Sequence, residues 1–254
     1  WQVRLLVLAA IIPWLGNILY ISRLDPISYF DWTPFAFTIA GLLLTISLFR
    51  FRLVDVLLIA QKAVFTGLMD SVLVLDMQAY FLDAESHAHI PSASAILPRL
   101  SGLAAAYAAH RLPVIYTRHV NTAQDAGLMA IWWRDLIQPD SPLSQIVPQF
   151  DLSQGRVLQK SQYDAFYQTD LERMLRSLGI RQVVIGGVMT HLCCETTARA
   201  AFGRGFEVFF LVDGTATYTE AYHRASLLNL AHGFAELKLV REITESLPEA
   251  AAHA

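Results

Sequence analysis

Three side chains with complementary chemistry stand out in the sequence. Asp76, Lys160 and Cys193 supply a carboxylic acid, an ammonium group and a thiol. A thiolate attacks a carbonyl carbon better than a thiol does, and a helix N-terminus or a neighbouring cation lowers the pKa of a cysteine. Asp76 could take up the thiol proton and return it to a leaving amine, with Lys160 as the cation. These residue types predict covalent catalysis by a thiol, with the pKa of Cys193 lowered.

The pattern of apolar segments indicates how these residues come together. Strands alternating with helices predict a parallel sheet covered on both faces, and sites in such folds form at the carboxyl ends of the strands. Asp76, Lys160 and Cys193 are each expected at such an end. The strands are expected at 71–76, 113–118, 156–160, 181–187, 206–213 and 235–240, and the helices at 94–112, 169–179, 193–203 and 219–233.

Three blocks of sequence carry a specific resemblance. VLVLDMQAYF, VLQKSQYDAFYQTDL and VIGGVMTHLCCETTARAAFGRGFEVFFLVDGTAT resemble the signature blocks of the isochorismatase-like cysteine hydrolase superfamily, in family order over residues 71–243. The resemblance implies a Rossmann-like, three-layer α/β/α fold with a six-stranded parallel sheet. It also implies Asp76 as base, Lys160 as supporting cation and Cys193 as nucleophile.

The same resemblance implies the geometry of the turn before the cysteine. It predicts a cis peptide bond between Val188 and Met189, and an oxyanion hole formed by the N–H groups of Met189 and Cys193. Such donors stabilise the negative charge that develops on a carbonyl oxygen during attack. The residue after the nucleophile, Cys194, is expected to face the core.

Differences from individual subfamilies narrow the expected substrate. Nicotinamidases carry an Asp-x-His metal site after the second strand, whereas this segment reads YTRHVNTAQDAG, so we expect no metal or other cofactor and disfavour nicotinamidase. Isochorismatases often have Gly where Cys193 stands, so the cysteine favours an amide, ureido or related C–N substrate over a vinyl ether. The candidate pocket residues are Phe81, His119, Trp132, Trp133 and Phe166, and structural roles are expected for His87, His89 and His191.

The first 70 residues differ in character from the rest of the chain. Only 16% of the chain is charged and its mean hydropathy is +0.40, with the apolar excess before residue 70. The runs 3–22 and 33–49 approach the length of about 20 apolar residues that spans a bilayer, and arginines flank their outer ends. We expect a transmembrane helical hairpin with both ends cytoplasmic and an amphipathic connecting helix over 53–69; the alternative is a pair of buried helices in a soluble core.

This segment also resembles a known membrane region. LLVLAAIIPWLGNILY, DWTPFAFTIAGLLL and FRFRLVDVLLIAQKAV resemble the last two helices of the seven-helix membrane sensor region of bacterial histidine kinases. No phospho-acceptor His motif or Gly-rich ATP-binding box follows, so the resemblance does not carry a sensor function to this chain.

These features together predict the organisation of the protein. We expect the hairpin and connecting helix over 1–70, a hydrolase domain over 71–243 and a tail over 244–254. The hydrolase domain would lie at the cytoplasmic side of a bacterial inner membrane, or in the cytoplasm if the N-terminal segment is an artificial join. A net charge of −3 without Lys/Arg clusters argues against nucleic acid, so the expected partners are a small-molecule substrate and, through the hydrolase domain, further copies of the chain. The two alternatives are a vinyl-ether hydrolase and a membrane sensor that only binds its ligand.

Overall fold

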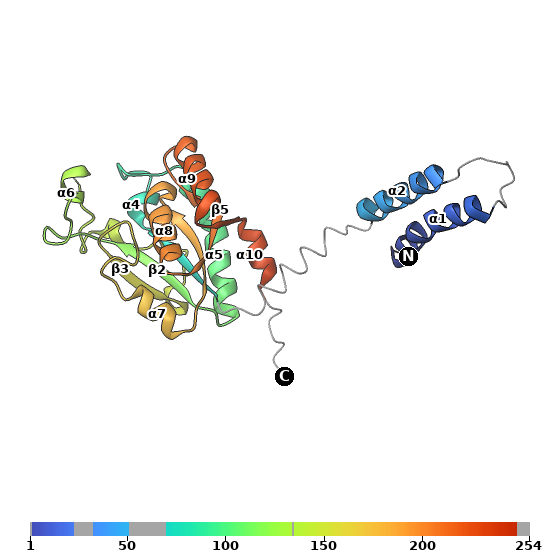
Figure 1. Cartoon of the computed structure of the whole chain (residues 1–254). Coiled ribbons are helices and arrows are strands. Elements are labelled where there is room, and N and C mark those ends of the chain that lie inside the picture. Colours follow the sequence, from blue (N-terminus) through green and yellow to red (C-terminus); the bar gives the residue numbers. More distant parts are fainter. Residues whose placement is uncertain (1, 23–32, 51–69, 134, 248–254) are drawn as a thin grey trace. The chain divides into compact units, whose positions relative to one another are not determined.

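The chain forms two compact units, Trp1–Val64 and Phe65–Ala254. The computed structural model describes residues 2–22, 33–50, 70–133 and 135–247 (Figure 1). In the first unit, helices α1 (Gln2–Ser22) and α2 (Thr33–Arg50) pack against each other. The connecting helix expected over 53–69 lies outside the described residues.

Helices α1 and α2 occupy the two apolar runs that were expected to form a transmembrane hairpin. Among the helices that the structure describes, none has the length and apolar character that crossing a membrane requires. The helical hairpin is therefore present, and its insertion in a membrane is not confirmed.

A six-stranded parallel sheet forms the centre of the second unit, in the order β3-β2-β1-β4-β5-β6. Strands β1 and β4 lie in the middle and are buried along their whole length, as strands covered on both faces are expected to be. The chain runs outward from β1 to β3, then crosses back to β4 and runs outward to β6, so the strand order reverses between β1 and β4. The strands are β1 (Asp70–Leu75), β2 (Val114–His119), β3 (Arg156–Lys160), β4 (Gln182–Val188), β5 (Glu207–Ala216) and β6 (Glu236–Lys238).

Helices cover both faces of the sheet, which completes the three expected layers (Figure 1). Helices α5 (Ala93–Ala109) and α10 (Val240–Ser246) contribute to the apolar core on one face. Helices α7 (Leu171–Ser177), α8 (Glu195–Gly203) and α9 (Glu220–Gly233) contribute to the core on the other. Because successive side chains of a strand point to opposite faces, Val72 and Val74 enter the first core, whereas Leu73 and Leu75 enter the second.

Two boundaries differ from those expected. The last strand ends at Lys238, and α10 (Val240–Ser246) follows, so the predicted tail over 244–254 begins inside a helix. This helix has only two turns, which is too short for hydrophobic periodicity to reveal. The helix expected to start at Cys193 starts at Glu195, after a π-helical turn (Thr190–Cys194).

Gly187 explains how β4 comes so close to β1 at the carboxyl edge of the sheet. Its φ is +124°, and a Cβ atom there would lie 2.1 Å from the carbonyl oxygen of Leu75. Only glycine fits this position, because any side chain would overlap the neighbouring strand. The residues that follow this close pair are Asp76, after Leu75 of β1, and Val188, after Gly187 of β4. Both lead into the candidate site.

Candidate active site

The three residues expected to act together meet at the carboxyl edge of the sheet. Asp76 follows β1, Lys160 ends β3, and Cys193 lies in the π-helical turn after β4. The Nζ atom of Lys160 lies 2.8 Å from Oδ2 of Asp76 and 3.4 Å from Sγ of Cys193. A carboxylate oxygen of Asp76 lies within 4.8 Å of the Cys193 sulfur. These contacts lie at the reversal of strand order, where open α/β sheets bind their ligands.

Asp76 is held in place by the neighbouring strand β2. Its N–H donates to the hydroxyl oxygen of Thr117 over 3.0 Å, and this hydroxyl donates to Oδ1 of Asp76 over 2.5 Å. The φ of Asp76 is 52°, in the left-handed region that Asp tolerates better than most residues. The chain therefore turns sharply out of β1, while the Thr117 hydroxyl holds both the backbone N–H and the carboxylate of Asp76, with one hydrogen bond to each.

Asp76 and Lys160 form an ion pair whose side chains are both fully buried. Burial is the largest single effect and raises the pKa of the Asp76 carboxyl, but the Lys160 charge and several smaller interactions together outweigh it, so the pKa lies below its ordinary value. Burial is the largest single effect and lowers the pKa of the Lys160 ammonium, but the Asp76 charge and the interactions with Cys193 together outweigh it, so the pKa lies above its ordinary value. Both groups are therefore charged at neutral pH.

Cys193 behaves differently from the sequence expectation. Burial raises the pKa of its thiol to about 12, and the Asp76 carboxylate adds to the increase, while Lys160 opposes it. The expected lowering of this pKa is wrong because the thiol is nearly inaccessible to water and lies close to an anion. At neutral pH the resting site therefore contains a neutral thiol close to a charged carboxylate.

The turn before Cys193 has a distinctive backbone. The peptide bond between Val188 and Met189 is cis. The N–H groups of Leu192 and Cys194 both donate to the Met189 carbonyl oxygen, at 3.1 and 3.2 Å. The N–H of Cys193 lies between these two donors in sequence. In the described part of the chain, it is not among the groups that donate to the Met189 carbonyl oxygen.

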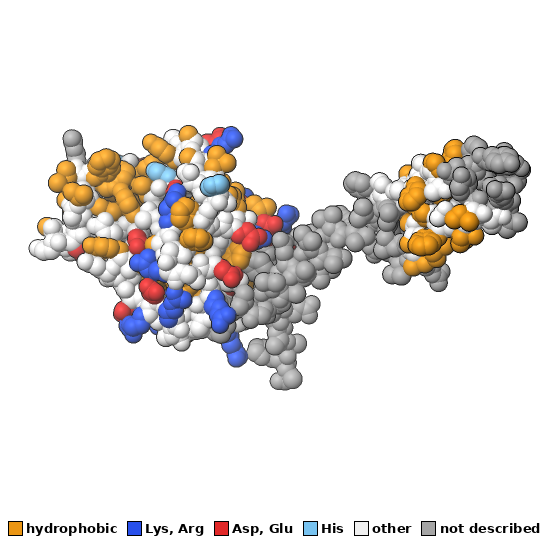
Figure 2. All heavy atoms as spheres, in the orientation of Figure 1, with side chains coloured by type: hydrophobic (Ala, Val, Ile, Leu, Met, Phe, Trp, Pro, Cys, Tyr) orange, Lys and Arg blue, Asp and Glu red, His pale blue; other side chains and the backbone are white. Residues whose placement is uncertain are grey.

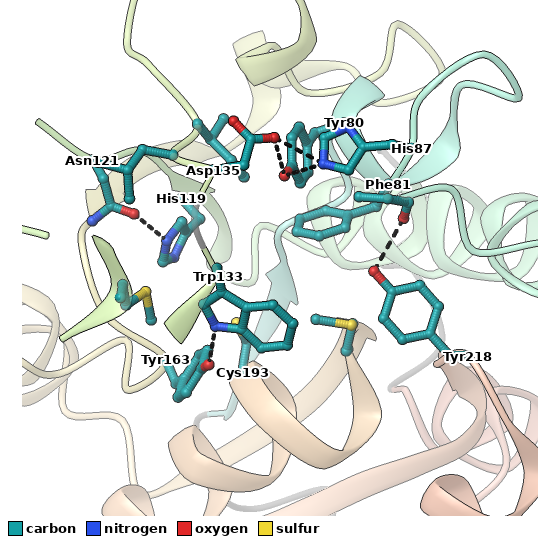
Figure 3. A pocket seen from close by; sticks show the side chains of 15 residues that line it. Tyr80, Phe81, His87, His119, Asn121, Trp133, Asp135, Tyr163, Cys193 and Tyr218 are labelled. Atoms are coloured by element: carbon teal, nitrogen blue, oxygen red, sulfur yellow. Dashed lines mark hydrogen bonds and ion pairs between the residues drawn. The ribbon is translucent and has the colours of Figure 1, made fainter. Parts of the chain in front are cut away.

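A cavity of about 200 Å³ leads to the Cys193 thiol (Figure 3). Three of the expected pocket residues line it: Phe81, His119 and Trp133. The indole N–H of Trp133 donates to the Tyr163 hydroxyl over 2.5 Å, which connects two loops at the mouth of the pocket. The other lining residues are Tyr80, His87, Ala88, Asn121, Met129, Asp135, Leu136, Ile137, Tyr163, Met189 and Tyr218.

Two expected pocket residues lie elsewhere. Trp132 is 78% exposed, and with Leu128 and Ile131 it forms an apolar surface patch over α6 (Met129–Trp132) (Figure 2). It points away from Trp133 because neighbouring residues on a helical turn are about 100° apart. Phe166 is buried in the core beneath α7 and α8 and stacks on Phe206, with their ring centres 5.9 Å apart.

Two histidines that were expected to have only structural roles have defined partners. Nε2 of His87 lies 2.8 Å from Oδ2 of Asp135 and 3.1 Å from the Tyr80 hydroxyl, so these three groups form a polar cluster in the pocket wall. Nδ1 of His191 lies 2.8 Å from the Thr217 hydroxyl, outside the pocket lining. The sequence gives no signal for the first cluster because its members come from a short helix, α4 (Ala79–Leu82), and from two separate loops.

Within the described part of the chain, one group of three side chains could in principle hold a metal ion. Ligand atoms of Asp76, His119 and Cys193 lie within 4.8 Å of one another. The Lys160 ammonium, however, lies 2.8 Å from Asp76 Oδ2, 3.1 Å from His119 Nδ1 and 3.4 Å from Cys193 Sγ. A second cation at this point would be repelled by the first, so these residues do not fit a metal ion.

Comparisons with known proteins agree with this geometry. Residues 71–242 match the sequence profile of the Isochorismatase domain. The chain belongs to the isochorismatase family. This assignment confirms the first resemblance and the prediction of an isochorismatase-like hydrolase. Residues 1–57 match the N-terminal 7TM region of histidine kinase, which confirms the second resemblance.

Individual relatives of this isochorismatase-family chain carry several names. Nicotinamidase 3 of Arabidopsis thaliana is 42% identical over 144 residues, covering 54% of this chain and 71% of the relative. Enterobactin synthase component B of Escherichia coli is 28% identical over 179 residues, covering 68% of this chain and 61% of the relative. A cysteine hydrolase from Pseudomonas syringae has a similar structure, with a TM-score of 0.68 and 26% identity over 70% of this chain and 92% of that one.

The electrostatics of the site predict how the thiol reacts with iodoacetamide. In Asp76→Asn the carboxylate that raises the Cys193 pKa is gone, so alkylation at pH 8 should become about tenfold faster or more. In Lys160→Met the cation that lowers this pKa is gone, so alkylation should become slower. Tandem mass spectrometry separates Cys193 from Cys194, whose fully buried thiol serves as the internal control. Slower alkylation in Asp76→Asn than in the unmodified protein would contradict this account of the site.

Proposed function

We propose that the isochorismatase-like domain hydrolyses a C–N bond of a small amide or ureido compound through a thioester at Cys193. The observation that carries the proposal is the neutral thiol held between the Asp76 carboxylate and the Lys160 ammonium, at the end of a pocket. A binding module has no need for a buried nucleophile paired with a base and a cation. The constellation therefore supports catalysis over the alternative of a ligand sensor.

The proposed reaction begins with proton transfer. Sγ of Cys193 bonds to the carbonyl carbon while its proton passes to Asp76, and the negative charge moves to the carbonyl oxygen. The N–H groups of Met189 and Cys193 are the proposed donors to this oxyanion. Asp76 then gives the proton to the leaving nitrogen, the C–N bond breaks, and a thioester remains.

Water completes the cycle. It attacks the thioester carbon while Asp76 accepts one of its protons, and the acid product leaves as the thiolate takes a proton back to become a thiol. Lys160 stabilises the sulfur whenever it carries negative charge, because its Nζ lies 3.4 Å away. Asp76 thus acts as base and acid in both halves of the reaction, and its lowered pKa keeps it ionised at neutral pH.

The walls of the pocket support a planar, compact substrate. A volume of about 200 Å³ is below the roughly 300–1,000 Å³ of pockets for drug-sized ligands. The rings of Phe81 and Trp133 supply flat apolar surface. The polar cluster of Tyr80, His87 and Asp135 supplies hydrogen-bonding groups in the same wall. A small aromatic or heteroaromatic amide fits this combination.

Nicotinamide belongs at the head of the substrate panel. It is the amide named in a relative that is 42% identical to this chain. The sequence argument against nicotinamidase concerned a metal site, because the Asp-x-His spacing of its ligands is missing. In the structure the Lys160 ammonium lies among the three potential ligands Asp76, His119 and Cys193, where a metal ion would otherwise sit. We propose that any amide hydrolysis in this pocket proceeds without a metal.

Replacement of the nucleophile tests the proposed chemistry directly. Cys193→Ala should lower kcat for amides by about 1,000-fold or more, because no thioester can form. Circular dichroism should be unchanged, since the side chain is small. Intact-protein mass spectrometry of the unmodified enzyme during turnover should show the acyl adduct. Full activity in Cys193→Ala would overturn the covalent mechanism, and turnover restricted to vinyl ethers would favour the isochorismatase-type alternative.

Two adjacent tryptophans provide a matched test of the pocket. Trp133→Ala should raise KM for aromatic amides by about tenfold, because an indole that lines the pocket is lost. Trp132→Ala should leave KM within about twofold, since this side chain is 78% exposed and lies outside the pocket. Steady-state kinetics on the substrate panel measures both. Equal effects of the two substitutions would show that the aromatic wall does not bind substrate.

Membrane attachment and self-association stay predictions of the sequence. The match of residues 1–57 to a membrane region supports attachment through the N-terminal segment, with the catalytic domain on the cytoplasmic side. If the proposal is right, the full chain expressed in bacteria should resist extraction from membranes by alkaline carbonate, while a 65–254 fragment should not sediment with them. Full release of the intact chain by carbonate would contradict membrane insertion.

A further inference from the structure

His119 and Asn121 lie next to the site and take no part in the reaction as proposed. His119 is the last residue of β2 and pairs with Lys160 of β3 in the sheet. Its Nδ1 lies 3.1 Å from Nζ of Lys160, and its Nε2 lies 2.9 Å from Oδ1 of Asn121. The Asn121 amide nitrogen in turn donates to the carbonyl oxygen of Ser161 over 2.7 Å (Figure 3 shows the His119–Asn121 contact).

Only one placement of protons satisfies this chain of contacts. The Ser161 carbonyl can only accept, so the NH₂ group of Asn121 faces it and Oδ1 faces His119. Because Oδ1 can only accept, Nε2 of His119 carries the proton. A neutral imidazole then has an unprotonated Nδ1, which accepts a hydrogen bond from Lys160. A backbone carbonyl thus determines the tautomer of a histidine two contacts away.

The Lys160 ammonium has more acceptors than protons. Nζ has three N–H groups, and its neighbours are Oδ2 of Asp76, the Gln162 carbonyl, Nδ1 of His119 and Sγ of Cys193, at 2.8, 2.9, 3.1 and 3.4 Å. In the resting site the sulfur is a neutral thiol and a weak acceptor, so the imidazole holds the third N–H. When the sulfur gains negative charge, it competes for that N–H.

We propose that His119 and Asn121 are positioning residues that hold the Lys160 ammonium on a neutral imidazole, from which one N–H shifts to the sulfur of Cys193 during reaction. The inference rests on the proposed function, because Lys160 is the cation of that mechanism. His119 acts only while neutral, since an imidazolium would offer Lys160 no acceptor and would add a second positive charge beside it.

The surroundings keep His119 neutral. Burial lowers the pKa of His119 to about 4, and the Lys160 charge adds to the decrease, while Asp76, Asn121 and the Gln162 backbone oppose it. The remaining titratable group near the ring is the Cys193 thiol, which is neutral in the resting site. At neutral pH His119 is therefore uncharged, and Lys160 is the cation beside Asp76 and Cys193 that the mechanism uses.

Asn121→Asp tests the tautomer chain, because a carboxylate next to Nε2 stabilises the imidazolium. The pKa of His119 should rise by about 1–3 units, and the acid limb of the kcat–pH profile should move upward with it, since activity is lost as His119 gains a proton. Asn121→Leu, the matched control without a charge, should lower kcat without moving this limb upward. NMR titration of histidine-labelled enzyme, with His119→Asn to assign the resonance, measures the pKa.

Substitution of His119 supplies a second test, which does not require the Asn121 variants to fold correctly. His119→Leu should lower kcat by about tenfold or more, and His119→Asn, which keeps a polar acceptor near the position of Nδ1, should recover most of the loss. An unchanged acid limb in Asn121→Asp, or equal kcat values for the Leu and Asn variants, would overturn the proposal. The NMR titration requires no turnover, so it tests the hydrogen-bond chain even if Cys193→Ala disproves the proposed function.

Discussion

The buried ion pair between the Lys160 ammonium and the Asp76 carboxylate is the interaction on which the rest of the site depends. Both charges are removed from water. Transferring each ion from water costs several kcal/mol, which the protein recovers only if the pair is close and its remaining hydrogen-bonding capacity is used. Four potential acceptors surround Nζ, so the condition is met for the ammonium. Because loss of one partner would leave an uncompensated buried charge, stability depends on the same contact that the proposed mechanism uses.

Strand β2 aligns this ion pair although it supplies neither charge. It lies between β1 and β3, and side chains two residues apart on a strand point the same way. Thr117 therefore reaches Asp76 at the end of β1, while His119 reaches Lys160 at the end of β3. Asn121, two residues further on, fixes His119. An alternating Thr-x-His-x-Asn set thus positions both members of the pair from the strand between them.

Much of this architecture could be predicted from the sequence because it depends on local patterns. Buried strands are apolar runs, and residues at their carboxyl ends converge in any parallel sheet, which placed Asp76, Lys160 and Cys193 together. The walls of the pocket could not be predicted in the same way. Trp132 and Trp133 are adjacent and chemically alike, and only the orientation of one helical turn exposes the first and brings the second into the pocket. Phe166 follows Lys160 closely in sequence, yet it packs in the core.

The pKa of Cys193 shows a deeper limit of sequence reasoning. A helix start and a nearby cation both argue for a thiolate, but burial and the Asp76 carboxylate outweigh them. These opposing effects come from residues more than 30 positions apart, so only the folded structure decides the sign. The outcome has a chemical advantage. A neutral thiol that is almost closed off from solvent is less reactive toward oxidants than a thiolate. In the proposed mechanism it becomes nucleophilic only as its proton passes to Asp76 during attack on a carbonyl carbon.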